Sequence, residues 1–215
     1  PSGARRRFRV RASDLVGRVF LADLVAGLRA AAPGVELDVL HLDPTETVDA
    51  LATGRIDLAL STGLERRSGI ESLPLAQDRM VAVLSADHPA AGGWRSLEAF
   101  LALPHLRVAI SPTDRRFVDA VLSARGLRRH VALTVPHWLL VPHLLRGSDL
   151  VATMPHRLAA ALASPDLALR PLPFETEPFE WRVYWHARSS GDGGLLWLRD
   201  RLLESGGSGA GDLEE

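Results

Sequence analysis

Cysteine and lysine are both missing from this sequence of 215 residues. Without cysteine the chain can form no disulfide, supply no thiolate nucleophile and hold no cysteine-ligated metal. Without lysine, all 25 basic residues are arginine. We attribute this bias to a GC-rich coding sequence rather than to a demand for guanidinium chemistry.

Long apolar runs and a strong net charge are also absent. No stretch approaches the ~20 apolar residues that a membrane-spanning helix needs, and no signal peptide is recognisable. The formal net charge is −1, which argues against nucleic-acid binding by this chain alone, since such domains usually carry a basic patch. One basic cluster, residues 5–7 with Arg9 and Arg11, is interpreted as the solvated start of a strand that follows a linker from an upstream domain.

Catalytic signatures are missing as well. The chain has no Gly-x-Ser-x-Gly elbow, no His-Glu-x-x-His pair and no phosphate-binding loop. Its eight histidines are scattered without metal-ligand spacing, and His137 and His143 are six residues apart with a proline between them. Although fold alone does not exclude catalysis, we expect no enzyme activity, no cofactor and no metal.

What the sequence does contain is an alternation of strands and helices. It is 47% hydrophobic and 24% charged, typical of a soluble globular protein with a substantial core. Residues 135–161 indicate a short apolar helix, a turn, a buried strand and a helix opened by Pro155. Residues 50–60 indicate a helix, Gly54 as its stop, and another buried strand. Such alternation is typical of a sheet with helices on both faces.

The alternation predicts two similar α/β units. In the first we expect strands at 8–12, 35–42 and 56–60, and helices at 15–31 and from Thr45 or Thr47 to 53. In the second we expect strands at 106–110, 131–135 and 150–154, and helices at 97–101, 115–125, 138–146 and 156–163. Further strands are expected at 70–75, 79–85 and 181–186, and a last helix at 195–203.

The predicted fold class is α/β, with two Rossmann-like lobes joined by two crossover strands, 79–85 and 181–186. Lobe one comprises 1–84 plus 186–204 and lobe two comprises 85–185. Residues 205–215 are Gly/Ser-rich, acidic and expected to be disordered. A hinged pair of this kind is expected to bind its ligand between the lobes, at the carboxyl ends of the strands.

Candidate ligand-binding residues are those that follow strands and precede helices. Ser13 opens a helix amino terminus suited to an anion or polar group, whereas simple capping is the alternative for Ser13 and the favoured role of Asp14. The other candidates in lobe one are Pro44, Thr45, Thr47, Thr62 and Gly63.

In lobe two, the preferred candidate is Thr113, which follows the expected strand 106–110. Arg115 could meet a carboxylate, but a solvated or salt-bridged arginine is favoured. His137 follows strand 131–135 and could hydrogen-bond a carboxylate or phenol. Trp138 could stack on an aromatic ligand or fill the core, and Trp185 could be structural or ligand-facing.

An ordered series of segments resembles one protein family. The series comprises 8–14 (FRVRASD), 32–40 (APGVELDVL), 54–60 (GRIDLAL), 87–91 (DHPAA), 126–137 (GLRRHVALTVPH), 149–159 (DLVATMPHRLA) and 185–199 (WHARSSGDGGLLWLR). The chain is similar to the effector-binding domain of LysR-type transcriptional regulators. Within that family it resembles the branch of salicylate- and nitroaromatic-responsive and nodulation-gene regulators.

The resemblance implies the type 2 periplasmic-binding-protein fold and effector contacts from the loops of lobe one. His137 and Trp138 match the arrangement of the salicylate-type members, whereas residues 111–116 depart from it, so salicylate is not assumed. The implied function is sensing of a small organic effector, with an aromatic carboxylate favoured. The signal would pass through a homodimer, or a tetramer when full length, using helices 15–31 and 115–125.

Promoter DNA would be bound only through an N-terminal winged helix-turn-helix domain that this chain lacks. The protein would act in the cytoplasm and would not bind a membrane. The alternative from another class is a periplasmic solute-binding protein of a transporter, which shares this fold.

Overall fold

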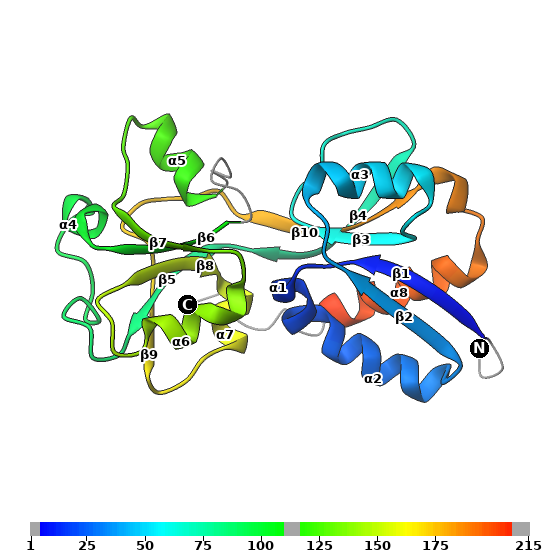
Figure 1. Ribbon diagram of the computed structural model, residues 1–215, viewed down its shortest axis with the longest axis horizontal. Coiled ribbons are helices and arrows are strands. Elements are labelled where there is room, and N and C mark those ends of the chain that lie inside the picture. Colours follow the sequence, from blue (N-terminus) through cyan, green and yellow to red (C-terminus); the bar gives the residue numbers. More distant parts are fainter. Residues whose placement is uncertain (1–4, 110–116, 208–215) are drawn as a thin grey trace. The chain divides into compact units, whose positions relative to one another are not determined.

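The computed structural model describes residues 5–109 and 117–207. It consists of two units, shown with their elements in Figure 1. Unit 1 comprises Pro1–Gln77 and Phe179–Glu215, and unit 2 comprises Asp78–Pro178. The chain therefore passes from unit 1 to unit 2 and back again.

Unit 1 is built on a five-stranded sheet with the order β2-β1-β3-β10-β4. The strands are β1 (Arg6–Arg11), β2 (Val35–Leu40), β3 (Leu58–Ser61), β4 (Ile70–Asp78) and β10 (Phe179–His186). β1 pairs in parallel with both β2 and β3, and β3 pairs antiparallel with β10. Because β1, β2 and β3 are parallel, their carboxyl ends lie at one edge of the sheet.

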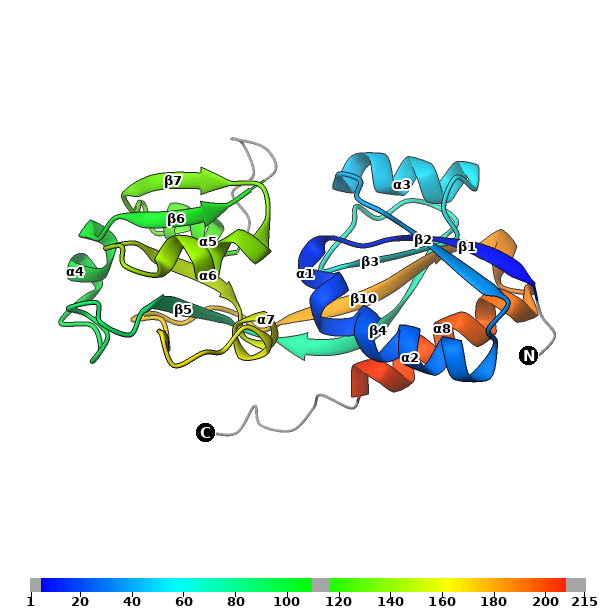
Figure 2. The same ribbon diagram turned by 60° about the horizontal axis from the view of Figure 1, so that its bottom comes forward.

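Helices cover both faces of this sheet (Figures 1 and 2). They are α1 (Asp14–Val16), the π-helical η1 (Gly17–Leu21), α2 (Ala22–Ala31), α3 (Pro44–Thr53), the 3-10 helix η3 (Ala187–Ser189) and α8 (Gly193–Gly207). The crossover from β1 to β2 and the crossover from β2 back to β3 run in opposite directions. Right-handed connections therefore place α1–α2 and α3 on opposite faces, with α8 on the side of α2.

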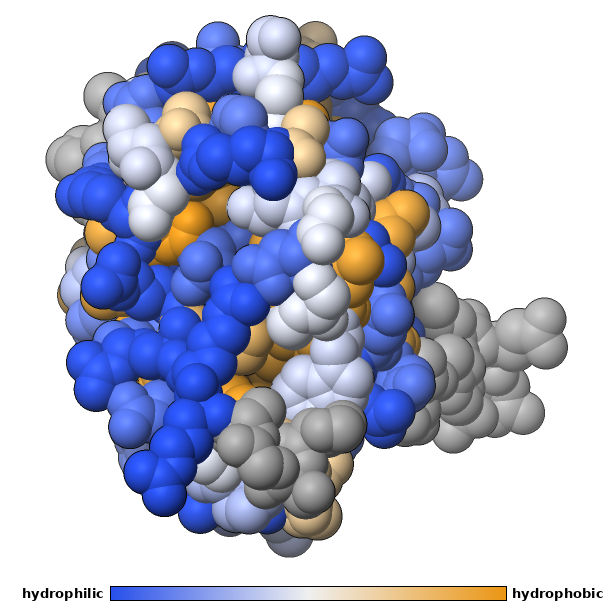
Figure 3. All heavy atoms as spheres, turned by 90° about the vertical axis from the view of Figure 1, so that its right-hand side faces the viewer, coloured by the Kyte–Doolittle hydropathy of each residue, from blue (hydrophilic) through white to orange (hydrophobic). Residues whose placement is uncertain are grey.

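The core of unit 1 contains alternate residues of its strands, including Phe8 and Val10, both almost fully buried. Phe20 of η1 packs edge-on against Trp181 of β10, with the ring centroids 5.9 Å apart. The outer surface is different: Figure 3 shows a mostly hydrophilic face with apolar patches between the polar side chains. The unit thus has its own apolar interior, as an independent folding unit requires.

Unit 2 repeats the plan, with the strand order β7-β6-β8-β5-β9. Its strands are β5 (Met80–Ser85), β6 (His105–Val108), β7 (Val131–Val135), β8 (Val151–Pro155) and β9 (Leu167–Arg170). Its helices are α4 (Leu97–Ala102), α5 (Val118–Ala124), the 3-10 helix η2 (Trp138–Leu140), α6 (Val141–Leu145) and α7 (His156–Ala161). β6 is parallel to β7 and β8, while β5 is antiparallel to β8 and β9.

The predicted α/β class and the pair of similar units are confirmed. The division between the units, however, lies earlier in the chain than the expected boundaries at 84/85 and 185/186. The reason is strand pairing: β5 lies between β8 and β9 in unit 2, and β10 lies beside β3 in unit 1. Each of these strands belongs to the sheet that it helps to complete.

Several local expectations need correction. The single helix expected at 15–31 contains the π-helical turn η1, and the helix expected at 138–146 begins as a 3-10 helix. The strand β9 was not expected at all. The last helix extends to Gly207, so residues 205–207 are helical, while the rest of the expected disordered tail lies outside the described residues. No helix among the described residues is long and apolar enough to span a membrane.

Candidate functional site

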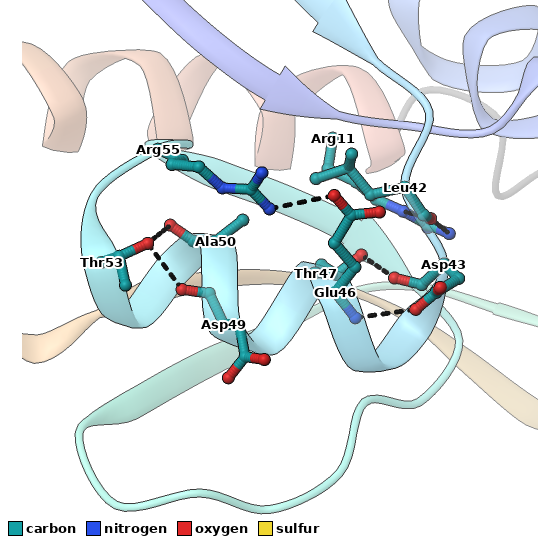
Figure 4. A network of polar contacts seen from close by, with 9 residues as sticks. All are labelled: Arg11, Leu42, Asp43, Glu46, Thr47, Asp49, Ala50, Thr53 and Arg55. Carbon is teal, nitrogen blue, oxygen red and sulfur yellow. Dashed lines mark hydrogen bonds and ion pairs between the residues drawn. The ribbon is translucent and has the colours of Figure 1, made fainter.

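Arg11 holds the carboxyl ends of three strands together in unit 1. Its guanidinium donates from Nε and Nη2 to the carbonyl oxygen of Leu42, at 3.0 and 2.9 Å, and from Nη1 to that of Leu60, at 2.9 Å. The residue is only 6% exposed. Arg11 was expected to be solvated together with the other arginines of the basic cluster. For Arg11 this expectation is wrong, because the turn after β2 covers the end of β1 and buries its side chain. Figure 4 shows Arg11 next to the start of α3.

Ser13 lies two residues beyond Arg11, where β1 gives way to the helical segment α1–η1–α2. Its Oγ accepts a long hydrogen bond, 3.4 Å, from the amide N–H of Val16, so Ser13 is the N-cap of α1. The side chain is half-buried. A hydroxyl can accept this bond and still donate its proton to a ligand. Capping and ligand binding are therefore compatible roles for Ser13.

The start of α3 contributes at the same edge of the sheet. Asp43 is its N-cap, with Oδ1 accepting from the amide of Glu46 at 2.7 Å, and Pro44 occupies the first turn. Thr45 is exposed. Thr47 is fully buried, and its hydroxyl donates to the carbonyl oxygen of Asp43 at 2.5 Å. Figure 4 shows the contacts of Asp43 with Glu46 and Thr47, which direct the hydroxyl of Thr47 to its own helix.

Thr62 and Gly63 complete the edge of unit 1. They follow directly after β3, whose last residue is Ser61. Thr62 is half-buried and Gly63 is exposed. The parallel register of β1 with β2 and β3 brings these residues to the same sheet edge as Ser13 and Thr45. The edge therefore presents hydroxyl groups and a helix amino terminus, which suit a polar or anionic group.

In unit 2 the corresponding edge carries His137 and Trp138. They follow β7, and the amide of Ala109 donates to the carbonyl oxygen of Val135 at 3.0 Å, so the ends of β6 and β7 are adjacent. His137 is exposed and Trp138 is half-buried. Thr113 and Arg115, which were expected at this edge, lie outside the described residues.

Two apolar residues at this edge were not singled out from the sequence. Leu139 and Leu140 of η2 are 42% and 41% exposed, although leucines in a segment this apolar would ordinarily be buried. They lie next to His137 and Trp138 in the chain. We define residues 137–140 as the η2 tip. It combines one imidazole with an aromatic ring and two leucine side chains, which suit an amphipathic ligand.

Trp185 is not brought to either edge. It lies in β10 of unit 1, beyond the point where Tyr184 pairs with Ala59, toward the amino end of β3. It is 6% exposed, its Nε1 donates to Ser190 Oγ at 2.9 Å, and the guanidinium of Arg199 lies 5.2 Å from its ring centroid. These contacts favour the structural role that the sequence left open.

Within residues 5–109 and 117–207, no group of three or more histidine, aspartate or glutamate side chains could hold a metal ion. The candidate residues provide hydrogen-bonding groups at the edge of unit 1 and apolar surface at the edge of unit 2. Side chains of both kinds are typical of ligand-binding sites.

Comparison with known proteins agrees with this description. The family model described as "LysR substrate binding domain" matches residues 1–207. The chain is 30% identical to the HTH-type transcriptional activator NagR of Ralstonia sp over 205 residues, which are 95% of this chain and 68% of NagR. It is 29% identical to the HTH-type transcriptional activator NahR of Pseudomonas putida, with the same coverage.

A solved structure shows the same likeness. The regulatory domain of MexT, a transcriptional activator in Pseudomonas aeruginosa, is 31% identical and superimposes with a TM-score of 0.83. The match covers 94% of this chain and 98% of that domain. The fold is thus that of LysR regulatory domains, the type 2 periplasmic-binding-protein fold. The chain belongs to the LysR substrate-binding domain family and is the effector-binding domain of a LysR-type transcriptional regulator.

Proposed function

We propose that this domain senses a small organic acid, and that the acid is an aromatic carboxylate. The observation that carries the proposal is the grouping of Ser13, Thr45 and Thr62 at one sheet edge, beside the buried guanidinium of Arg11. Hydroxyl donors, a helix amino terminus and a nearby cation all favour a carboxylate over a neutral or cationic ligand.

The η2 tip supports the aromatic part of the proposal. Trp138 can stack on a ring, Leu139 and Leu140 expose apolar surface, and the imidazole of His137 can hydrogen-bond a carboxylate or a phenol. The resemblance to salicylate- and nitroaromatic-responsive regulators points to the same class. That one ligand contacts both edges at once stays a prediction.

The regulatory role is proposed from the family. Differential affinity of the effector for one conformation would shift the population of states. The change would reach promoter DNA through an N-terminal winged helix-turn-helix domain and through a homodimer or tetramer, in the cytoplasm. The alternative, a periplasmic solute-binding protein of a transporter, is disfavoured because the relatives are transcriptional activators.

The proposal is tested with His137→Ala and Ser13→Gly, using thermal shift against benzoate, salicylate and their neutral amides. A ligand present at about 100 times its Kd stabilises the folded state by about 2.7 kcal/mol. We expect stabilisation by one or more of the acids, none by the amides, and a smaller effect in both variants. Glycine is chosen at Ser13 because it removes the hydroxyl but remains a tolerable N-cap.

The matched control is His143→Ala, which removes an exposed histidine from α6 in the same unit. It should leave the response to the acids unchanged. If no acid stabilises the unmodified chain, the aromatic-carboxylate assignment fails. If an acid stabilises both variants as strongly as the unmodified chain, the assignment of His137 and Ser13 to the site fails.

A further inference from the structure

A pocket lies in unit 1, over β4 and β10 rather than at the edge formed by β1, β2 and β3. Its volume is about 450 Å³, within the range of small-molecule sites. It is lined by residues 64–68 of the loop between β3 and β4, together with Ile70, Ser72 and Tyr184. None of these residues is among the candidates discussed above.

The floor of this loop pocket is apolar, with one hydroxyl at its end. Leu64 and Ile70 pack against the buried cluster that contains Tyr184. Tyr184 is 7% exposed, and its hydroxyl oxygen accepts from the amide of Leu64 at 3.3 Å. In the described part of the chain its O–H proton meets no acceptor. A phenol held in this way can donate to a bound oxygen.

The rim carries a cation that is available to a ligand. Arg67 is engaged in an ion pair with Asp49 of α3, and Ser72 accepts from Arg182 Nε at 3.1 Å. Arg66 is exposed and makes no ion pair or hydrogen bond with the described residues. The carboxylate of Glu65 also lines the rim, and this negative charge disfavours a dianion. One unpaired guanidinium therefore suits a ligand with a single negative charge.

We propose that the loop pocket is an accessory site for a small monocarboxylate with an apolar ring. The carboxylate would pair with Arg66 and accept from the hydroxyl of Ser68 or Tyr184, and the ring would lie on Leu64 and Ile70. The loop pocket is separate from the effector edge. The two are joined by the loop between β3 and β4, whose first residues, Thr62 and Gly63, lie at the effector edge. The proposal does not depend on which effector the main site binds.

Tyr184 provides a specific probe, because it is the only tyrosine in the sequence. Incorporation of 3-fluorotyrosine gives the chain a single 19F resonance in the wall of this pocket. We expect benzoate to shift that resonance in a saturable way, with a Kd on the order of 1 mM or tighter. Benzamide, which has the same shape without the charge, should shift it at least tenfold more weakly.

Arg66→Gln tests the cation. Loss of a charge-assisted hydrogen bond should weaken benzoate binding at this site about tenfold. The matched control is Arg9→Gln, which removes an exposed arginine of β1 in the same unit and should leave the titration unchanged. Both arginines are exposed, so neither substitution is expected to prevent folding.

The double variant Ser13→Gly with His137→Ala separates this site from the effector edge. If the Tyr184 resonance still responds to benzoate in the double variant and the response weakens in Arg66→Gln, the accessory site is supported, whatever happens at the effector edge. The proposal is overturned if benzoate does not shift the resonance, or if Arg66→Gln binds as tightly as the unmodified chain. Loss of the response in the double variant alone would also overturn it, because the resonance would then report the edge.

Discussion

At the scale of single residues, burial strongly affects the titration of His105. It is fully buried in unit 2, its Nε2 lies 2.8 Å from the carbonyl oxygen of Phe100, and its ring packs edge-on against the Phe100 ring at 4.8 Å. Its Nδ1 has no hydrogen-bond partner among the described residues. Burial is the main cause that lowers the pKa of His105 to about 4.

This shift predicts how stability depends on pH. The pKa of His105 is lower in the folded state than the ordinary value of 6.5, so the unfolded state binds the proton more readily. Stability is therefore fully present above pH 6.5 and falls as the pH drops toward 4. Between pH 7.5 and pH 5 we expect a loss of about 2 kcal/mol, measured by urea unfolding.

His105→Gln should flatten this pH dependence, because glutamine can still donate to Phe100 but does not titrate. His130→Gln is the control, since His130 is exposed in the same unit and should leave the slope unchanged. Equal slopes in His105→Gln and the unmodified chain would show that other groups cause the loss at low pH.

At the scale of elements, the carboxyl terminus of α3 is held by an arginine that is distant in sequence. Gly54 adopts a left-handed conformation, with φ of 77°, and ends the helix as the sequence predicted. Arg188 of η3 then donates from Nη1 to the carbonyl oxygen of Ala52 and from Nη2 to that of Leu51, both at 2.6 Å. The positive charge of Arg188 also interacts favourably with the partial negative charge at the carboxyl end of the helix. The contact joins α3 to the segment that follows β10.

Arg188→Met should therefore destabilise the domain by about 1 kcal/mol, because two carbonyl groups at the end of α3 lose their charged donor. Urea unfolding at neutral pH measures this change. Arg55→Met is the comparison, since Arg55 forms an exposed ion pair with Glu46 on the same helix and should cost less than about 0.5 kcal/mol. An equal effect of the two substitutions would count against the capping role.

At the scale of the whole molecule, we propose that exposed apolar residues of unit 1 belong to a dimer surface. Val25 of α2 and Val39 and Leu40 of β2 are 44%, 49% and 36% exposed. β2 is also an edge strand of its sheet, with backbone groups that a partner could cover. Val25 lies in helix 15–31, which was expected to take part in pairing together with helix 115–125, whereas Val39 and Leu40 lie in β2, outside both expected helices.

Val39→Lys should convert a dimer of this domain into a monomer, because a charge would be buried without a partner in the interface. Sedimentation equilibrium measures the change. Leu73→Lys is matched to it, since Leu73 is 37% exposed and lies in β4, the opposite edge strand of the same sheet. The dimer should survive that substitution. A dimer that tolerates Val39→Lys would move the interface away from β2.

Much of the fold follows from local signals in the sequence. Gly54 and the alternation of apolar residues placed α3 and β3 within two or three residues, because capping and side-chain periodicity act between near neighbours. The sequence also placed Ser13 and Thr62 at the ends of strands, and the parallel register then brought them to one edge. Asp43 was missed as the N-cap of α3, although an Asp-Pro pair is a recognisable signal.

What only the tertiary structure decided depends on partners that are far away in the chain. Arg11 is buried because the turn after β2 covers it, Thr47 is buried because α3 packs against β3 and β10, and β9 forms because β5 offers it an edge. The boundary between the units follows from the same long-range pairing of β5 and β10. The sequence alone determined the fold class and placed most of the candidate residues at strand ends, since these depend on local pattern, and its ordered series of segments indicated the family. Burial and strand partnership depend on which distant segments meet, and no local pattern encodes that.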